Sequence, residues 1–199
     1  MIEQAARALT LGELVVLPTD TVYGLCADPD TDASVRRLYA LKRRPEQQAV
    51  ALLAADVDDL FECVPELRGP IAAALRALLP GPYTFVVPNP ARRYRRLTGN
   101  DPEKLGVRVP DLPAAAVAVV GRVGAVAATS ANLHGGADPQ RLDEVPYEIR
   151  AACAAVVDGG ELPGIASTVV DVTGPEPRVL REGAVPAAEA IRRVAAALP

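Results

Sequence analysis

The chain has 199 residues, of which 50% are hydrophobic and 23% are charged. This length and composition exclude a disordered protein and predict one globular domain, whose core is large enough to need neither a disulfide nor a metal. The only histidine is His134, and the three cysteines, Cys26, Cys63 and Cys153, are widely spaced. These residues cannot supply the usual ligand spacing of a zinc or haem site.

An odd number of scattered thiols argues against a disulfide framework and favours a reducing compartment, so we expect a cytoplasmic protein. The N-terminal residues lack an export signal, and no apolar run, 114–120 and 151–157 included, is longer than seven residues. A membrane-spanning helix needs roughly 20 residues, so no membrane association is expected. The net charge of −4 gives no overall attraction to nucleic acid, and any anion site must be local.

Strand-like and helical segments alternate along the chain. Runs rich in valine and leucine predict strands over residues 14–18, 49–53, 83–87, 106–110, 125–129, 154–158, 167–172 and 178–181. Apolar residues at helical spacing predict helices over residues 2–11, 33–43, 66–79, 113–120, 143–153 and 187–198. Asp111 and Asp143 are candidate helix-start residues. The alternation predicts one α/β domain over residues 1–199, with a twisted mixed sheet, flanking helices and no internal repeat.

The segment PTDTVYGL, residues 18–25, follows the first predicted strand. Pro18 cannot continue a central ladder, so we expect Thr19, Asp20 and Thr21 to leave the sheet as a turn. Hydroxyl and backbone N–H groups in such a turn suit carboxylate or phosphate oxygens. Local hydrogen bonds of the threonine and aspartate side chains are the simpler interpretation of the same residues.

Basic residues gather at the end of the helix predicted over residues 33–43. Pro45 keeps Arg44 out of the helical region, so Lys42 lies in the last turn and Arg44 just beyond it, where both can reach one point. Alternatively, these cations only complement the helix dipole. A denser cluster, ARRYRRLTG over residues 91–99, could contact a polyphosphate or RNA, or could form a solvated loop of like charges.

Small polar residues follow the strand predicted over residues 125–129. Thr129, Ser130 and Asn132 lie at the end of a strand, where ligands usually bind in α/β folds. A serine hydrolase is disfavoured, because Ser130 lacks the context of a nucleophile elbow and His134 lies in a glycine-rich loop.

Two arginines belong to strands that carry a polar side chain on one face. Arg108 alternates with valines, so it faces either solvent, which is the commoner case, or a site that needs a fixed cation. Ser167 begins a later strand, and Arg181 ends the strand after it. The combined polar residues are cationic and hydroxylic, which suits a reaction limited by charge, such as phosphoryl or nucleotidyl transfer. They are Lys42, Arg44, Arg108, Arg181, Thr19, Ser130, Asn132 and Ser167.

Over residues 3–190 the chain resembles the YrdC-like threonylcarbamoyl-AMP synthases, because eight motifs occur in the order and spacing of that family. The motifs are PTDTVYGL, LKRRP, PGPYTFVV, GVRVPDLP, TSANLHGG, DGG, STVVDV and VLREG. The resemblance implies a twisted α/β sheet with a deep basic groove. It also implies an enzyme that joins L-threonine, bicarbonate and ATP into threonylcarbamoyl-AMP and releases pyrophosphate. This nucleotidyl transfer is the first step of tRNA threonylcarbamoyladenosine modification, so a tRNA-modifying transferase complex is the expected downstream partner.

Motif by motif, the resemblance also implies residue roles. The ATP phosphates fall to Lys42, Arg44, Ser130 and Asn132, and Arg181 is a further ATP contact. Threonine and its carbamate fall to Thr19, Arg108 and Ser167, with Thr129 beside them. Mg²⁺ is expected to help bring the two anions together, and the metal ligands are not assigned.

Two positions depart from the family pattern. Leu53 stands where relatives often carry a His after the K-x-R-P motif, and His134 stands where they more often have Ser. The intact TSAN motif favours the synthases over a paralogous branch with another nucleotide or carbamoyl substrate. A non-catalytic RNA-binding module is the other alternative. Because the sequence ends directly after its last predicted helix, we expect the short family type without a C-terminal domain.

Overall fold

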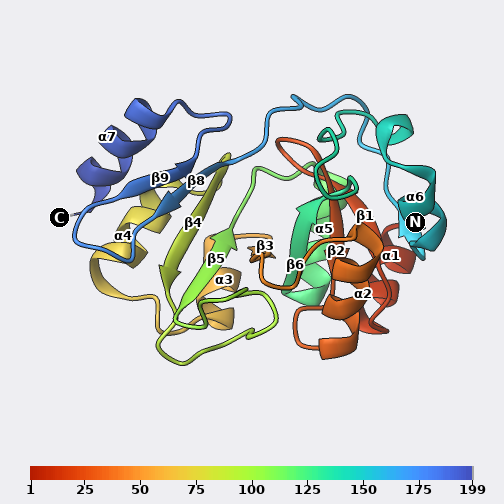
Figure 1. Cartoon of the computed structure of the whole chain (residues 1–199), viewed down its shortest axis with the longest axis horizontal. Helices are drawn as coiled ribbons and strands as arrows, with labels where there is room; N and C mark the ends of the chain where they lie inside the picture. The colour runs from red at the N-terminus through yellow and green to blue at the C-terminus, as the bar shows by residue number, and fades with distance from the viewer. Residues whose placement is uncertain (199) are drawn as a thin grey trace.

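Nine hydrogen-bonded strands form one mixed sheet in the computed structural model, which describes residues 1–198 (Figure 1). Their order across the sheet is β7-β1-β2-β6-β3-β5-β4-β8-β9. The pairs β1–β7, β3–β5 and β4–β8 are parallel, and the other neighbours are antiparallel. The strands span β1 (Val15–Pro18), β2 (Tyr23–Ala27), β3 (Ala51–Ala54), β4 (Tyr83–Pro88), β5 (Lys104–Arg108), β6 (Ala125–Ser130), β7 (Ala155–Val156), β8 (Thr168–Asp171) and β9 (Arg178–Arg181).

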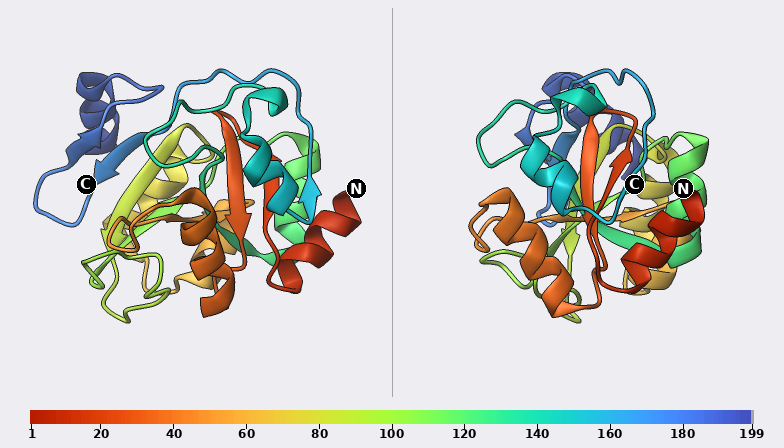
Figure 2. Two further views of the ribbon diagram at one scale, coloured as in Figure 1. Left: turned by 45° about the vertical axis from the view of Figure 1, so that its right-hand side comes forward. Right: turned by 90° about the vertical axis from the view of Figure 1, so that its right-hand side faces the viewer.

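The helices flank this sheet on both faces. They span α1 (Ile2–Thr10), α2 (Asp32–Lys42), α3 (Val57–Cys63), α4 (Gly69–Leu78), α5 (Ala114–Val123), α6 (Tyr147–Ala152) and α7 (Ala187–Ala197), with a 3-10 turn at Leu142–Glu144. α1 contacts α5 at one end of the sheet, and α4 contacts α7 at the other end (Figures 1 and 2). This arrangement confirms the predicted α/β fold class. Among the residues described, no helix combines the length and apolar character of a membrane span.

Side chains of each strand alternate between the two faces of the sheet, and a separate hydrophobic core lies on each face. One core contains Leu25, Leu52 and Val107 and includes residues of α2, α3, α4, α6 and α7. The other contains Cys26 and Leu53 and lies beneath α1 and α5. Within residues 1–198, strand residues of the second core come from β1, β2, β3, β6 and β7. The same face of β5, β4, β8 and β9 is therefore left without a helix, and this uncovered half is where a ligand can reach the sheet.

A long connection, residues 157–167, crosses from β7 at one edge of the sheet to β8 near the other edge (Figures 1 and 2). It is fixed on the way, because the N–H of Gly164 donates to the Thr21 carbonyl at 2.8 Å. Gly164 has a left-handed φ of +77°, and a Cβ there would lie 2.1 Å from the Gln140 side chain. Only glycine fits this position. The connection thereby brings Ser167 to the same side of the sheet as the turn between β1 and β2.

Two elements were not predicted, and one predicted helix is interrupted. β2 was not predicted, because its residues YGLCA form neither a valine- and leucine-rich run nor an alternating pattern. The strand predicted over 14–18 is β1 and includes Pro18, as expected; β7 pairs only with Val15 and Val16, so Pro18 needs no ladder partner on that side. α3 was also missed. The helix predicted over 143–153 is interrupted at Pro146, and Pro146 and Pro113 occupy the N-cap positions that were expected at Asp143 and Asp111.

Candidate functional site

A cleft of about 400 Å³ lies over the uncovered half of the sheet. This volume falls in the range of small-molecule sites, roughly 300–1,000 Å³. The floor is formed by small residues on four neighbouring strands, so that a ligand can approach the backbone of the sheet closely. These residues are Gly24, Ala51, Gly106 and Ala128. The cleft brings together seven of the predicted site residues: Thr19, Arg44, Arg108, Thr129, Ser130, Ser167 and Arg181.

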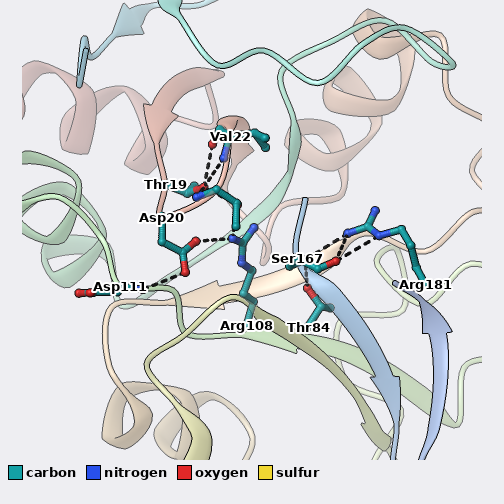
Figure 3. A network of polar contacts seen from close by, with 9 residues as sticks. Thr19, Asp20, Val22, Thr84, Arg108, Asp111, Ser167 and Arg181 are labelled. Atoms are coloured by element: carbon teal, nitrogen blue, oxygen red, sulfur yellow. Dashed lines mark hydrogen bonds and ion pairs between the residues drawn. The ribbon is translucent and has the colours of Figure 1, made fainter. Parts of the chain in front are cut away.

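Arg108 lies at the end of β5 and faces the cleft, with only 12% of its side chain exposed. The commoner expectation, an arginine in solvent, is therefore wrong, because this face of β5 belongs to the uncovered half of the sheet. One guanidinium nitrogen, Nη2, donates to Asp20 Oδ1 at 2.5 Å (Figure 3). The same nitrogen donates to Thr21 Oγ1 at 2.6 Å. Asp20 also accepts the backbone N–H of Asp111 at 3.3 Å. Asp20, which the sequence analysis placed only in a turn, thus fixes the direction of Arg108.

A second donor of Arg108 is free. Its Nε–H is buried and has no acceptor among residues 1–198. Buried polar groups nearly always have a partner, so an unpaired donor is unusual on a residue that lines the cleft. Burial lowers the pKa of Arg108, and the neighbouring Asp20 carboxylate opposes that change. The guanidinium remains charged because its ordinary pKa is above 12.

Thr19 closes the turn between β1 and β2. Its hydroxyl donates to the Val22 carbonyl at 2.7 Å and accepts the N–H groups of Thr21 and Val22 (Figure 3). Thr19 therefore makes the local hydrogen bonds of the simpler interpretation, whereas Asp20 pairs with Arg108 on a distant strand. Thr19 also lines the cleft, so a ligand would meet a hydroxyl whose donor is already used.

Ser167 and Arg181 meet on the opposite wall of the cleft. Arg181 reaches back from the end of β9, and its guanidinium donates to the Ser167 carbonyl at 2.8 Å and to its Oγ at 3.1 Å (Figure 3). The Ser167 hydroxyl also contacts Thr84 Oγ1 at 2.8 Å. Gly183 makes this approach possible, since a Cβ there would lie 2.2 Å from the Ala166 carbonyl. Thr84 was not predicted; its alternation with Tyr83 and Phe85 in β4 was the available signal.

Lys42 and Asn132 lie behind the cleft wall rather than in it. Lys42 is the last residue of α2 and is 2% exposed. Its Nζ donates to the carbonyls of Ser130 at 2.6 Å and Asn132 at 2.8 Å and to Asn132 Oδ1. Ser130, whose hydroxyl donates to Asn132 Oδ1 at 2.8 Å, lines the cleft in front of them. Burial lowers the pKa of Lys42 to about 8, with a further contribution from Arg44.

The two arginines that follow α2, Arg43 and Arg44, point in different directions. Arg43 has a left-handed φ of 54°, and the N–H of Arg44 donates to the Tyr39 carbonyl at 2.9 Å, as in a Schellman motif. The Arg44 guanidinium then reaches the cleft and donates to the Ala49 carbonyl at 2.8 Å. Arg43 instead pairs with Glu148 at 3.2 Å on the surface.

The far end of the cleft carries charged residues that the sequence analysis missed. Lys104 in β5 pairs with the buried Asp171 of β8 at 3.0 Å. Although burial opposes it, hydrogen bonds from Thr173 and Lys104 lower the pKa of Asp171 to about 2. Asp101 and Asp138 also line the cleft. Leu53 lies beside Arg108 on the neighbouring strand and contributes an apolar wall.

The arginines of the basic cluster over residues 91–99 lie outside the cleft lining, to which this segment contributes only Thr98. Arg92 pairs with Glu103 at 2.8 Å, Arg93 with Glu66 at 2.8 Å, and Arg96 with Asp32 at 2.9 Å. These carboxylates offset most of the positive charge that the cluster could offer to a polyanion.

The described side chains give little support to a metal site or to a reactive cysteine. No group of three or more histidine, cysteine or acidic side chains that could hold a metal occurs in the part of the chain described. The cysteines are unpaired thiols, and burial raises the pKa of Cys26 and Cys153 to about 12. His134 is exposed and its ring contacts Gln48.

Comparison with known proteins agrees with this architecture. A family model for Sua5, YciO and YrdC, described as "Telomere recombination", matches residues 7–183. Threonylcarbamoyl-AMP synthase of Bacillus subtilis is 34% identical over 191 residues, which cover 92% of this chain and 54% of that enzyme. The enzyme of the same name from Methylococcus capsulatus is 42% identical over 131 residues, covering 66% of this chain and 70% of that enzyme.

The fold also matches a solved structure. The crystal structure of P. abyssi Sua5 complexed with L-threonine has a TM-score of 0.87 and 30% identity, and the match covers 96% of this chain and 56% of that one. The chain thus spans about half the length of some of its relatives. The family match over most of the sequence and the shared fold both confirm the resemblance found in the motifs. The chain belongs to the Sua5/YciO/YrdC family.

Proposed function

We propose that this chain is a nucleotidyltransferase that makes threonylcarbamoyl-AMP and pyrophosphate from L-threonine, bicarbonate and ATP. The observation that carries the proposal is the convergence of Arg44, Arg108 and Arg181 with the hydroxyls of Ser130 and Ser167 in one cleft. These residues come from five separate segments, and together they offer cations and donors to several anionic groups. The names of the relatives point to the same reaction.

The reaction has two bond-forming steps. The threonine ammonium loses a proton to solvent, and its amine attacks the carbon of bicarbonate; a C–N bond forms and water leaves, which gives the carbamate. A carbamate oxygen then attacks the α-phosphorus of ATP, while the bond from that phosphorus to the bridging oxygen breaks and pyrophosphate departs with the electron pair. The nucleophile is already an anion, so the second step needs no general base. It needs fixed positive charge to bring two anions together.

In the proposed site, different walls of the cleft bind threonine and the phosphates of ATP. Arg108, held by Asp20 and with its Nε–H free, is placed to receive the carboxylate or carbamate of threonine, with Ser167, Thr19 and Thr129 around it. Arg44 and Ser130 would bind the phosphates, and Arg181 would neutralise charge between the two substrates. Asn132 and Lys42 support this wall from behind.

Mg²⁺ fits this site as part of the nucleotide substrate. Asp101 and Asp138 line the cleft, but the described residues hold no cluster of three metal-ligating side chains. Mg²⁺ is usually held by phosphate oxygens and water with one or two carboxylates, which is what this cleft offers. The labile product would pass to a tRNA-modifying transferase complex, and the proposed location is the cytoplasm.

The test is pyrophosphate release that depends on both threonine and bicarbonate, with threonylcarbamoyl-AMP identified by mass spectrometry. Arg44→Ala and Arg43→Asn form a matched pair, because the two arginines are neighbours and only Arg44 reaches the cleft. We expect Arg44→Ala to lower kcat/KM for ATP by about 100-fold, the size of a lost charged contact to the transferring group, and Arg43→Asn to leave it unchanged. Pyrophosphate release without threonine would favour the paralogous branch. Salt-dependent tRNA binding without ATP binding would favour the RNA-binding module.

A further inference from the structure

Lys42 holds the loop of residues 130–138 at two points. Its ammonium binds the carbonyls of Ser130 and Asn132 and the Asn132 side chain. Its own carbonyl accepts the backbone N–H of His134 at 2.9 Å. One residue at the end of α2 therefore fixes both the start and the middle of this loop.

The ammonium has no donor left for a ligand. A lysine ammonium carries three N–H groups. Four oxygens of the loop, including the Ser130 hydroxyl at 3.4 Å, lie at hydrogen-bonding distance, so each proton has an acceptor. The residue is almost completely buried. A phosphate contact would require Lys42 to give up one of these bonds and leave a loop oxygen unsatisfied, which costs about 1–3 kcal/mol for a buried group.

Asn132 links the part of the loop that Lys42 holds to the residues that line the cleft. The Asn132 side-chain oxygen accepts the Ser130 hydroxyl at 2.8 Å, and its nitrogen donates to the Gly136 carbonyl at 2.6 Å and to Asp138 Oδ1 at 3.2 Å. Ser130 and Asp138 line the cleft, whereas Lys42 and Asn132 are behind it. A chain of hydrogen bonds thus links Lys42 to two groups that a ligand can touch.

We propose that Lys42 is a positioning residue that clamps the 130–138 loop from behind and does not contact the nucleotide. The proposal refines the proposed function, because the clamped loop presents Ser130 to the substrate. Its tests require no turnover, so an inactive protein would contradict the proposed function without touching the clamp.

The chain offers an internal control, because Lys42 and Lys104 are its only lysines. Lys104 lines the same cleft but is 35% exposed. Reductive methylation of the folded, nucleotide-free protein with ¹³C-formaldehyde should modify Lys104 and the N-terminal amine. Lys42 should react at least about tenfold more slowly, because its amine must first be released by local opening. Rapid methylation of Lys42 that ATP suppresses would show an open phosphate ligand and overturn the proposal.

A second experiment measures the loop itself by hydrogen–deuterium exchange. Lys42→Met keeps the side-chain length but removes the donors, so exchange of residues 130–138 should rise in the nucleotide-free protein. Adding the non-hydrolysable αβ-methylene analogue of ATP should restore part of the protection, because ligand binding and loop closure are linked. Arg44→Ala is the control: it should weaken binding of the analogue and leave exchange of the free loop unchanged. Unaltered exchange in Lys42→Met together with lost analogue binding would overturn the clamp. If Lys42→Met does not fold, the methylation of the natural chain decides alone.

Discussion

Arg108 and Lys42 are both buried cations of one site, but the protein stabilises them differently. Arg108 faces a carboxylate, Asp20, and its Nε–H has no acceptor among residues 1–198. Lys42 is surrounded by uncharged oxygens of the 130–138 loop, and its three protons are all used. The two cations therefore have different roles: one can bind a ligand, and the other holds neighbouring residues in place. A cation that is fixed by one part of its donor set can still receive a ligand, whereas a cation with every donor occupied can only shape the residues around it.

The largest effect expected from this comparison is at Arg108. Arg108→Met leaves the Asp20 carboxylate buried without its partner, so the free energy of unfolding should fall by about 3–5 kcal/mol. In the double variant Asp20→Asn/Arg108→Met, the unpaired charge is gone and most of that loss should be recovered. Activity should stay below about 1% in both variants, because the ligand contact is missing in each. Urea unfolding and pyrophosphate release give the two readouts.

That double variant separates stability from function at one position. If it regained activity together with stability, Arg108 would act only by filling its place in the fold. If it stayed as unstable as Arg108→Met, the Asp20 carboxylate would have found another partner. Either result would remove the distinction between the two buried cations.

The role of Arg108 could not be predicted from the local pattern alone. Alternation in GVRVP places Arg108 opposite Val107 and Val109, but it does not say which face of the sheet a helix covers. That depends on where α1 and α5 pack, and these two helices cover only one half of the face. The family motifs supplied what periodicity could not, because they identified Arg108 with a binding position.

The other predicted elements and site residues were found or missed for similar physical reasons. The predicted strands and most helices were found, because their apolar runs are long enough to fix both type and location. β2 was missed, since its residues YGLCA form neither a valine- and leucine-rich run nor an alternating pattern. Thr84, Lys104 and Asp138 enter the cleft through strand pairing and loop closure, which bring together residues far apart in the chain. Lys42 was grouped with Arg44 by proximity in sequence, and only the Schellman turn between them shows that their side chains separate.

A third cation, Lys104, lies between the two extremes, since it is paired with a buried carboxylate but partly open to solvent. The pKa of Asp171 is about 2 against an ordinary 3.8, so the folded state holds the charged form more strongly than the unfolded state. The stability that this provides is fully present above the ordinary pKa and is lost as the pH falls through about 2. Its size should be on the order of 1–2 kcal/mol after allowance for solvent around Lys104.

Asp171→Asn tests this sign. The difference in free energy of unfolding between the natural chain and the variant should be constant from about pH 5 to pH 7 and should shrink between about pH 4 and pH 2. Denaturant unfolding at each pH measures it. A difference that grows on acidification would mean that the carboxylate is held protonated in the fold and would contradict the ion pair with Lys104.

The smallest effect is expected for a cation on the surface. Arg93 pairs with Glu66 through two nitrogens at 2.8 Å, which lowers the pKa of that carboxyl, yet both side chains are partly exposed. Exposed pairs contribute little to stability because water screens them and both side chains lose freedom. Arg93→Ala should therefore leave pyrophosphate release unchanged and lower the melting temperature only slightly, and the shift should vanish in about 1 M salt, where the screening length is roughly 3 Å. A loss of activity would place the 91–99 cluster in the functional site, and a shift that persists in salt would mean that Arg93 stabilises the loop by packing rather than by charge.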